Sequence, residues 1–101
     1  MKDLSDFRIS YDKLSLIENH LPKEPIKLFQ IWFEELCKSN SVLEPNAMTL
    51  STVGNENKPR NRVVLLKKFS RKGFVFYTNY KSKKGIDITN NPNVSISFFW
   101  P

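Results

Sequence analysis

Cysteine, histidine and glycine are all scarce in this sequence of 101 residues. The single cysteine, Cys37, excludes an intramolecular disulfide and a zinc site built from cysteines. The single histidine, His20, excludes sites of several histidines within the chain and leaves little scope for a catalytic dyad. Three glycines are not spaced as in a phosphate-binding Walker loop or a Rossmann fingerprint. The sequence therefore assigns no catalytic residue and predicts no metal.

Long apolar runs are also missing. No run approaches the roughly 20 residues that a membrane-spanning helix needs. The polar, acidic start lacks the apolar core of a signal peptide. Together with the single cysteine, these features predict a protein of the reducing cytoplasm that does not bind membranes. With 40% hydrophobic and 26% charged residues, the composition is that of an ordinary globular domain with one modest core.

Positive charge, in contrast, is abundant in one segment. The formal net charge is +6, from 16 basic and 10 acidic residues. Residues 58–84 hold ten of the basic residues and no acidic one, so the remainder has six basic against ten acidic residues, a net of −4. Such a segment attracts a polyanion or a phosphorylated small molecule. The alternative is a solvated basic face that only keeps the protein soluble.

The residue pattern predicts two helices. Apolar residues at i, i+3, i+4 and i+7 predict an amphipathic helix from Pro25 to about Ser39 whose stripe packs in the core. That stripe is Phe29, Trp32, Phe33 and Leu36, with Ile26 and Cys37 beside it. Cys37 is expected to be buried as a small apolar side chain. A second, short helix is predicted over residues 82–90, with Ser82 as its N-cap.

Four strands are predicted, over residues 47–53, 60–69, 74–78 and 93–100. The second contains the apolar run 63–66, which is typical of a strand buried on both faces. Short connections favour an antiparallel meander. The apolar fourth strand would leave Phe98, Phe99 and Trp100 poorly covered. We therefore expect either another chain at that edge or a longer protein of which this is the front part.

Two features indicate where an anion would bind. Arg62 and Lys67 flank the apolar run, but an odd separation on a regular strand makes them face opposite ways. They could still line one groove if a bulge or strong twist intervenes, or if the ligand runs along the strand. The second feature is the start of the short helix, where Lys83 and Lys84 would join the free N–H groups and the positive dipole end. The alternative for this second feature is a solvent-exposed basic helix start.

Several motifs in the same order resemble the pyridoxamine 5′-phosphate oxidase family. They are Arg-Val-Val-Leu-Leu-Lys at 62–67, Gly-Phe-Val-Phe-Tyr-Thr-Asn at 73–79, Ser-Lys-Lys at 82–84 and Asn-Asn-Pro-Asn-Val-Ser at 90–95. Segments 25–29 and 44–48 are also similar to the family, and the resemblance runs from about Arg8 to Trp100. Because the motifs are separate and ordered, together they are more specific than any one of them.

The resemblance implies a mainly β fold with α, an FMN-binding split β-barrel that works as a homodimer. In this chain the barrel is expected to be incomplete. It would comprise an N-terminal arm (1–24) and then a truncated domain (25–101) with a helix, a meander of about four strands and a short helix before the last strand. The implied reaction is oxidation of pyridoxamine or pyridoxine 5′-phosphate to pyridoxal 5′-phosphate, with O₂ as acceptor, in vitamin B6 metabolism. FMN carries the redox chemistry, which suits a chain with few acid–base residues.

By resemblance, the FMN contacts lie on the second strand, at the end of the third and at the start of the short helix. They are Arg62, Val63, Val64, Leu65, Leu66, Lys67, Tyr77, Thr78, Lys83 and Lys84. Lys67 would also contact the substrate phosphate, and Arg8 and Tyr11 would fold over the substrate. The family usually has arginine where Lys83 stands, so that contact keeps its charge but loses a bidentate fork.

Family members are longer, and their second half supplies further strands, flavin contacts and substrate contacts. This chain is therefore expected to be an N-terminal half whose site is completed by a C-terminal half. One alternative is a catalytically inactive remnant that binds flavin or pairs with another chain. Another is a basic nucleic-acid-binding module, which we disfavour because the flavin interpretation explains the basic residues position by position.

Overall fold

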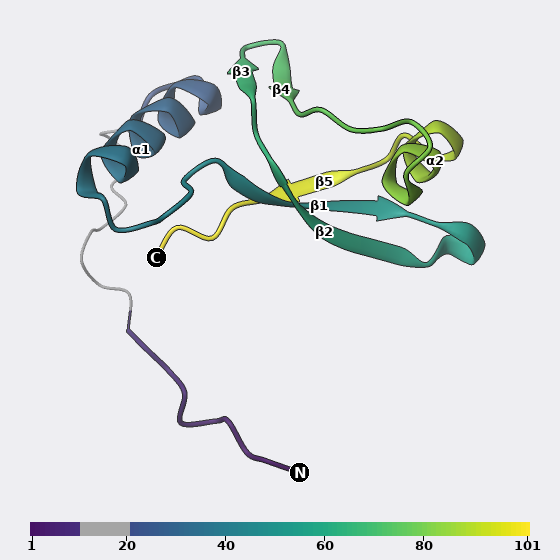
Figure 1. The fold of residues 1–101 in the computed structure, drawn as a ribbon. Helices are drawn as coiled ribbons and strands as arrows, with labels where there is room; N and C mark the ends of the chain where they lie inside the picture. The colour runs from purple at the N-terminus through teal and green to yellow at the C-terminus, as the bar shows by residue number, and fades with distance from the viewer. Residues whose placement is uncertain (11–20) are drawn as a thin grey trace.

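The structure is a computed structural model that describes residues 1–10 and 21–101. A small sheet lies between two helices, with helix α1 (Pro25–Ser39) toward one end and helix α2 (Lys83–Asn90) at the other (Figure 1). Residues 1–10 are exposed and extend away from the rest as a tail (Figure 1). Both helices begin and end where the sequence pattern predicts, within one residue.

The central sheet has three antiparallel strands in the order β2-β1-β5. They are β1 (Ala47–Val53), β2 (Pro59–Leu65) and β5 (Ser95–Ser97), and a 3-10 turn (η2, Asn55–Asn57) joins the first two. Burial alternates along β1, so that Met48, Leu50 and Thr52 lie on the buried face. Leu50 stands opposite Arg62 in the register, which places this arginine on the same face.

The meander prediction is correct for neighbouring strands but wrong for the last one. β1 pairs with β2, and β3 (Lys68–Ser70) pairs with β4 (Gly73–Val75) in a separate two-stranded sheet. β5 pairs with β1 instead of β4, because the second edge of β1 is open whereas β4 lies in the other sheet. The third and fourth strands are also shorter than predicted, since β4 pairs over the three residues of β3 and β5 over three residues of β1.

The predicted strand over residues 60–69 is divided at Leu66 and Lys67. The Leu66 N–H donates to the Asn46 carbonyl at 2.8 Å, and the Asn46 side-chain amide donates to the Leu66 carbonyl at 3.0 Å. One residue later the Lys67 N–H donates to the Val75 carbonyl at 2.8 Å. The chain thus changes its partner from the β1 side to β4 at this point. The expectation of burial on both faces is wrong, because β2 is an edge strand and Val63 is 70% exposed.

Aromatic rings pack α1 against the β3–β4 hairpin and the C-terminal segment. Phe29 lies in the centre of this aromatic cluster, 5.0 to 6.1 Å between ring centroids from its neighbours. Those neighbours are Phe33, Phe69, Phe74, Phe98 and Trp100. The Trp100 indole N–H donates to the Pro45 carbonyl at 3.2 Å, as a half-buried indole requires.

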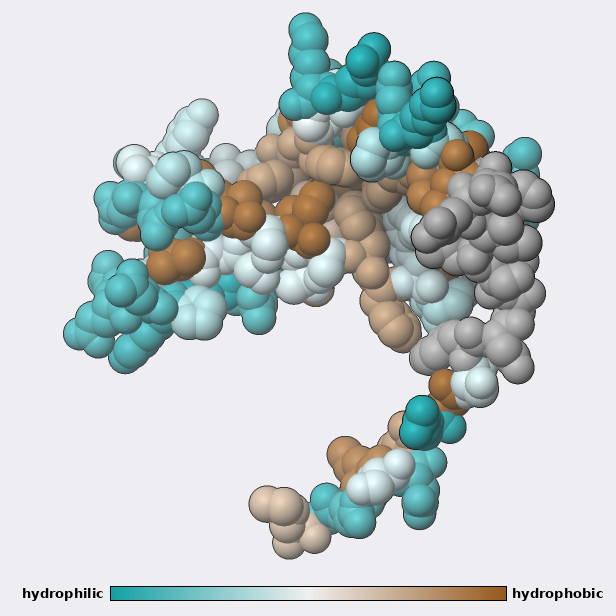
Figure 2. All heavy atoms as spheres, turned by 180° about the vertical axis from the view of Figure 1, so that it is seen from behind, coloured by the Kyte–Doolittle hydropathy of each residue, from teal (hydrophilic) through white to brown (hydrophobic). Residues whose placement is uncertain are grey.

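The contact face of α1 is narrower than the sequence predicts. Leu36 is buried, but Trp32 is 42% exposed and Cys37 is exposed, which contradicts the expectation that both lie in the core. Only one side of the helix meets the hairpin and the C-terminal segment, and these two residues lie off that side. Figure 2 shows apolar side chains open to solvent across the middle of one face of the molecule. Within the described ranges, no helix is long and apolar enough to cross a membrane.

Candidate functional site

Helix α2 begins at a tightly hydrogen-bonded polar turn. The Ser82 hydroxyl accepts the Gly85 N–H at 3.2 Å and donates to the Asn79 carbonyl at 2.7 Å. The Thr78 and Ser82 hydroxyls lie 3.3 Å apart. Ser82 is therefore the predicted N-cap, and it fixes the segment that follows β4 against the start of the helix.

Gly85 permits the close approach of α2 to the turn before it. A Cβ added at this position would lie 2.5 Å from the Asn79 carbonyl oxygen and 2.7 Å from that of Tyr80. Both atoms belong to the backbone, so neither can move aside as a flexible side chain would. This role cannot be seen in the sequence, because the short approach depends on how the turn folds back.

The first turn of α2 is positively charged and carries no acidic residue. Lys83 is exposed and Lys84 is half-buried. The free N–H groups and the dipole of the helix start add to their charge, so this end of α2 attracts an anion such as a phosphate group. Tyr77, which precedes the turn, is 65% exposed and offers an open ring and a hydroxyl. The donor set therefore fits a ligand with a phosphate group and a planar ring system.

One turn further along α2, Asp87 is the centre of a buried polar network. Its side chain is only 7% exposed. Its Oδ2 atom accepts the Thr52 hydroxyl at 3.0 Å and lies 3.7 Å from Arg60 Nε and 3.8 Å from Arg62 Nη2. The carboxylate thus has two cationic partners, which a buried charge requires. The network joins α2 to both β1 and β2.

Thr52 links the two charged groups of this network. Arg62 Nη1 donates to the Thr52 hydroxyl at 2.8 Å and approaches the carbonyls of Leu50 at 3.2 Å and Arg60 at 3.3 Å. The same hydroxyl donates to Asp87, so it receives one hydrogen bond and gives one. Thr52 is 1% exposed, and a guanidinium–hydroxyl–carboxylate chain at this burial is strongly polarised.

The network includes two residues that the sequence analysis missed. The sequence did contain an indication of the role of Asp87, because it is the single acidic residue between position 58 and the end of the printed sequence. A carboxylate alone among so many cations is expected to pair with some of them. Thr52 had no signal, since a threonine in a strand is unremarkable until its neighbour across the sheet is known.

The structure divides the predicted flavin contacts between two places. Arg62 lies against α2, whereas the Lys67 backbone lies beside Val75 and therefore near the Tyr77 segment. The rule that side chains alternate between the two faces of a strand does not apply from Arg62 to Lys67, because the chain changes sheets between them. Val63 projects from the opposite face of β2, and Leu66 is buried at 5% exposure. Of the substrate contacts, Lys67 and Arg8 are exposed, and Tyr11 lies outside the described residues.

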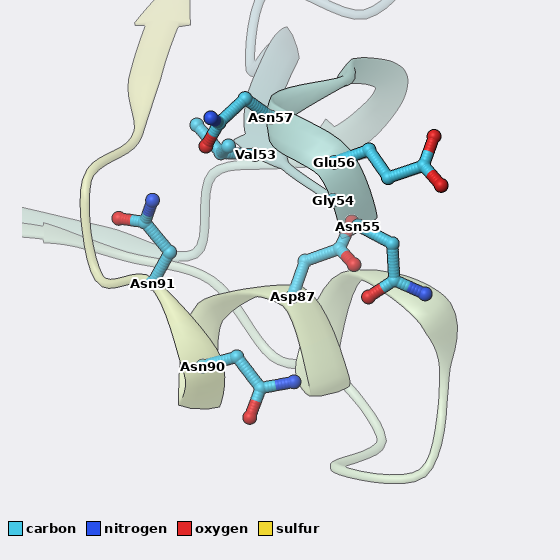
Figure 3. Close-up of a pocket in the computed structure, with 8 residues that line it drawn as sticks. All are labelled: Val53, Gly54, Asn55, Glu56, Asn57, Asp87, Asn90 and Asn91. Atoms are coloured by element: carbon cyan, nitrogen blue, oxygen red, sulfur yellow. The ribbon is translucent and has the colours of Figure 1, made fainter.

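Two hollows open on the surface of the molecule. One, of about 390 Å³, opens between the turn after β1 and the end of α2, and its residues include Asn55, Asp87 and Asn91 (Figure 3). The other, of about 520 Å³, lies between the start of α1 and the β3–β4 hairpin, with Phe29 and Phe74 in its wall. Neither hollow is lined by a residue predicted to contact flavin.

Comparison with known proteins gives a consistent family. The family described as "Pyridoxamine 5′-phosphate oxidase" matches residues 37–100. The pyridoxine/pyridoxamine 5′-phosphate oxidases of Flavobacterium psychrophilum and Flavobacterium johnsoniae are 53% and 55% identical over 100 residues. Each match covers 99% of this chain but 47% of the relative. The chain therefore spans about half the length of these relatives.

Solved structures support the same fold. PhzG from Burkholderia lata 383, in complex with tetrahydrophenazine-1-carboxylic acid, matches with a TM-score of 0.77 and 27% identity over 85% of this chain and 43% of that one. A pyridoxamine 5′-phosphate oxidase-related, FMN-binding protein from Nostoc punctiforme matches with a TM-score of 0.63 and 21% identity, covering 77% of this chain and 41% of that one. These matches confirm the predicted fold class: mainly β, with two helices and antiparallel strands that close no barrel among the described residues.

Proposed function

Because this chain belongs to the pyridoxamine 5′-phosphate oxidase family, we propose that it binds FMN and forms part of an enzyme of vitamin B6 metabolism. The enzyme would oxidise pyridoxamine or pyridoxine 5′-phosphate to pyridoxal 5′-phosphate with O₂ as acceptor. When bound, FMN supplies the redox chemistry, which is hydride acceptance from the substrate and reoxidation by O₂. The contribution of the chain is to bind FMN and to orient it.

The observation that carries this proposal is the start of α2. Ser82 and Gly85 hold the helix start against the preceding turn, and two lysines add positive charge there. We propose that Lys83 and Lys84 bind the phosphate of FMN, and that Thr78 and Tyr77 contact the cofactor beside it. The remaining contacts would come from residues 62–67 of β2 and the segment after it.

We further propose that the flavin lies between two copies of the chain. Apolar side chains at or beside the proposed contacts remain exposed, including Val63 at 70% and Val75, next to Lys67, at 42%. Apolar side chains that gather on one face, as Figure 2 shows, are typical of surfaces that a partner covers. Lys67 would bind the substrate phosphate, and residues 1–24 would form an arm that brings Arg8 and Tyr11 over the substrate. A cytoplasmic location agrees with the exposed, unpaired Cys37.

A flavin titration of the purified chain tests the proposal directly. FMN fluorescence is followed as protein is added, and the mass of the oligomer is recorded alongside. We expect saturable binding near one FMN per chain in a dimer. Absence of binding up to high micromolar FMN would overturn the proposal for this chain. Turnover with pyridoxamine 5′-phosphate then separates an active enzyme from a flavin-binding chain without activity.

A charge-matched pair of variants tests the phosphate contact. Lys84→Ala should weaken FMN binding by about 2 kcal/mol, because it removes a charge-assisted hydrogen bond to phosphate. Lys72→Ala removes the same charge from the turn between β3 and β4 and should leave FMN affinity nearly unchanged. Riboflavin, which has no phosphate, should bind both variants equally. Equal FMN affinity of the two variants would remove Lys84 from the site.

A further inference from the structure

The network around Asp87 joins β2 and α2, which are two of the elements that carry proposed flavin contacts. Lys84 and Asp87 are three residues apart on α2, and residues at this spacing are neighbours on the same side of a helix. Asp87 contacts Thr52 of β1 and lies close to Arg60 and Arg62 of β2. Whatever holds the Asp87 carboxylate therefore also holds the side of α2 that carries Lys84.

We propose that Asp87 and Thr52 are positioning residues of the flavin site, which hold Arg62 on β2 and the phosphate-binding turn of α2 in one fixed relation. This inference rests on the proposed FMN function. Neither residue needs to touch the cofactor. Asp87 acts through α2 and Arg62, and Thr52 acts as the hydrogen-bonded link between the carboxylate and the guanidinium.

The geometry of Arg62 supports a positioning role. Its side chain is 21% exposed, and Nη1 lies within hydrogen-bond distance of the Leu50 carbonyl and the Thr52 hydroxyl. Nη2 faces the Asp87 carboxylate. With both terminal nitrogens engaged, the guanidinium has one orientation against β1. Releasing Asp87 or Thr52 would free it to swing, and would free α2 to shift against the sheet.

Charge alone predicts the opposite result from positioning. Asp87 is an anion in a region that would bind an anion, so removing its charge should tighten FMN binding if long-range electrostatics dominates. If instead the carboxylate positions the site, removing its charge should weaken FMN binding. The sign of the change therefore separates the two interpretations.

The test compares four variants with the wild-type chain by FMN and riboflavin titration. Asp87→Asn removes the charge and keeps the shape, and Thr52→Val removes the hydroxyl without a change of charge. Thr52→Ser keeps the hydroxyl and removes only the methyl group. Glu56→Gln is the charge-matched control, because the Glu56 side chain is 79% exposed and lies in the turn between β1 and β2.

We expect Asp87→Asn and Thr52→Val to weaken FMN binding about tenfold, which corresponds to the loss of a good charge-assisted hydrogen bond. Thr52→Ser should keep most of the wild-type affinity for FMN, and Glu56→Gln should leave it unchanged. The preference for FMN over riboflavin should shrink in the first two variants. A role limited to stability would leave that preference unchanged in the folded fraction.

The outcomes distinguish this inference from the proposed function. If the wild-type chain fails to bind FMN, the proposed function itself is wrong. If the wild type binds while Asp87→Asn binds equally or more tightly, only the positioning role is wrong. Should Asp87→Asn fail to fold, the Thr52→Val and Thr52→Ser pair decides. Unchanged FMN affinity in Thr52→Val, or a loss of affinity in Thr52→Ser as large as in Thr52→Val, would overturn the inference.

Discussion

Different forces hold the helix in place at the two ends of the molecule. At the α1 end, the aromatic cluster centred on Phe29 packs a helix against a hairpin through ring contacts. At the α2 end, helix and sheet meet through the Asp87 network and the Ser82 turn. Dispersion and hydrophobic contacts are weakly directional, whereas hydrogen bonds and ion pairs demand particular atoms at particular positions.

This difference suggests that one end mainly stabilises the fold and the other mainly positions the proposed site. The aromatic cluster can stabilise the α1 end and still tolerate exchange of one apolar side chain for another. The polar end contributes less to stability, since removing charges from water offsets much of the gain from pairing them. What it provides is a single arrangement of α2 against β2, where the proposed contacts lie. Four predictions test this comparison, from the largest effect to the smallest.

Phe29→Ala should cause the largest loss of stability. The half-buried ring lies among several others at centroid distances near 5 Å, so its removal breaks the contacts that join α1 to the hairpin and the C-terminal segment. We expect a loss of about 3 kcal/mol in the free energy of unfolding, measured by urea denaturation. Phe29→Leu should lose much less. A similar loss in both variants would show that the cluster is more directional than we infer.

Gly85→Ala should be the most damaging change at the polar end. The new methyl group would meet two backbone carbonyls at distances that no real Cβ adopts. We expect a loss of about 2 kcal/mol of stability, together with weaker FMN binding. Ile86→Ala, in the same helix at a position 49% exposed, is the control and should change little. Unchanged stability of the Gly85 variant would show that the turn over residues 79–80 adjusts easily.

Ser82→Ala should have a smaller effect on stability. It removes the N-cap of α2, and caps of this type are worth about 1 kcal/mol. Thermal unfolding followed by circular dichroism measures the loss, and Ser82→Thr, which keeps a capping oxygen, should recover most of it. If Ser82→Ala weakens FMN binding more than it lowers stability, the turn positions the site as well as the helix.

Lys58→Ala should have almost no effect. Its ammonium lies 3.5 Å from the Glu56 carboxylate, but both side chains are more than 70% exposed. Exposed pairs of this kind contribute less than about 0.5 kcal/mol. Urea denaturation at low and at high salt measures the difference. A loss as large as that of Ser82→Ala would contradict the view that burial gives the Asp87 network its importance.

The sequence predicts local features of this protein well. The bounds of both helices follow from apolar spacing, from Pro25 at the start of α1 and from Ser82 before α2. The capped, basic start of α2 was also predicted, from Ser82 and the two lysines that follow it. These features depend on residues within one or two turns of each other, so the pattern of the chain is sufficient to reveal them.

Features that depend on distant residues were predicted poorly. The division of the second strand depends on Asn46, which is twenty residues away from Leu66. The exposure of Cys37 depends on how narrow a face α1 presents to the hairpin. The Asp87 network joins positions 35 residues apart, and its threonine carries no sign of its role. In each case the deciding partner is brought close by the fold and not by the order of residues.

The sequence by itself thus determined the helices, the basic segment, the fold class and the family, because these depend on periodicity, composition and ordered motifs. The tertiary structure decided that β5 joins β1, that the chain changes sheets at Leu66, and that Asp87 lies beside Arg60 and Arg62. The physical reason is that pairing between strands and burial of charge are settled by competition among all available partners. Only the folded chain shows which partners win.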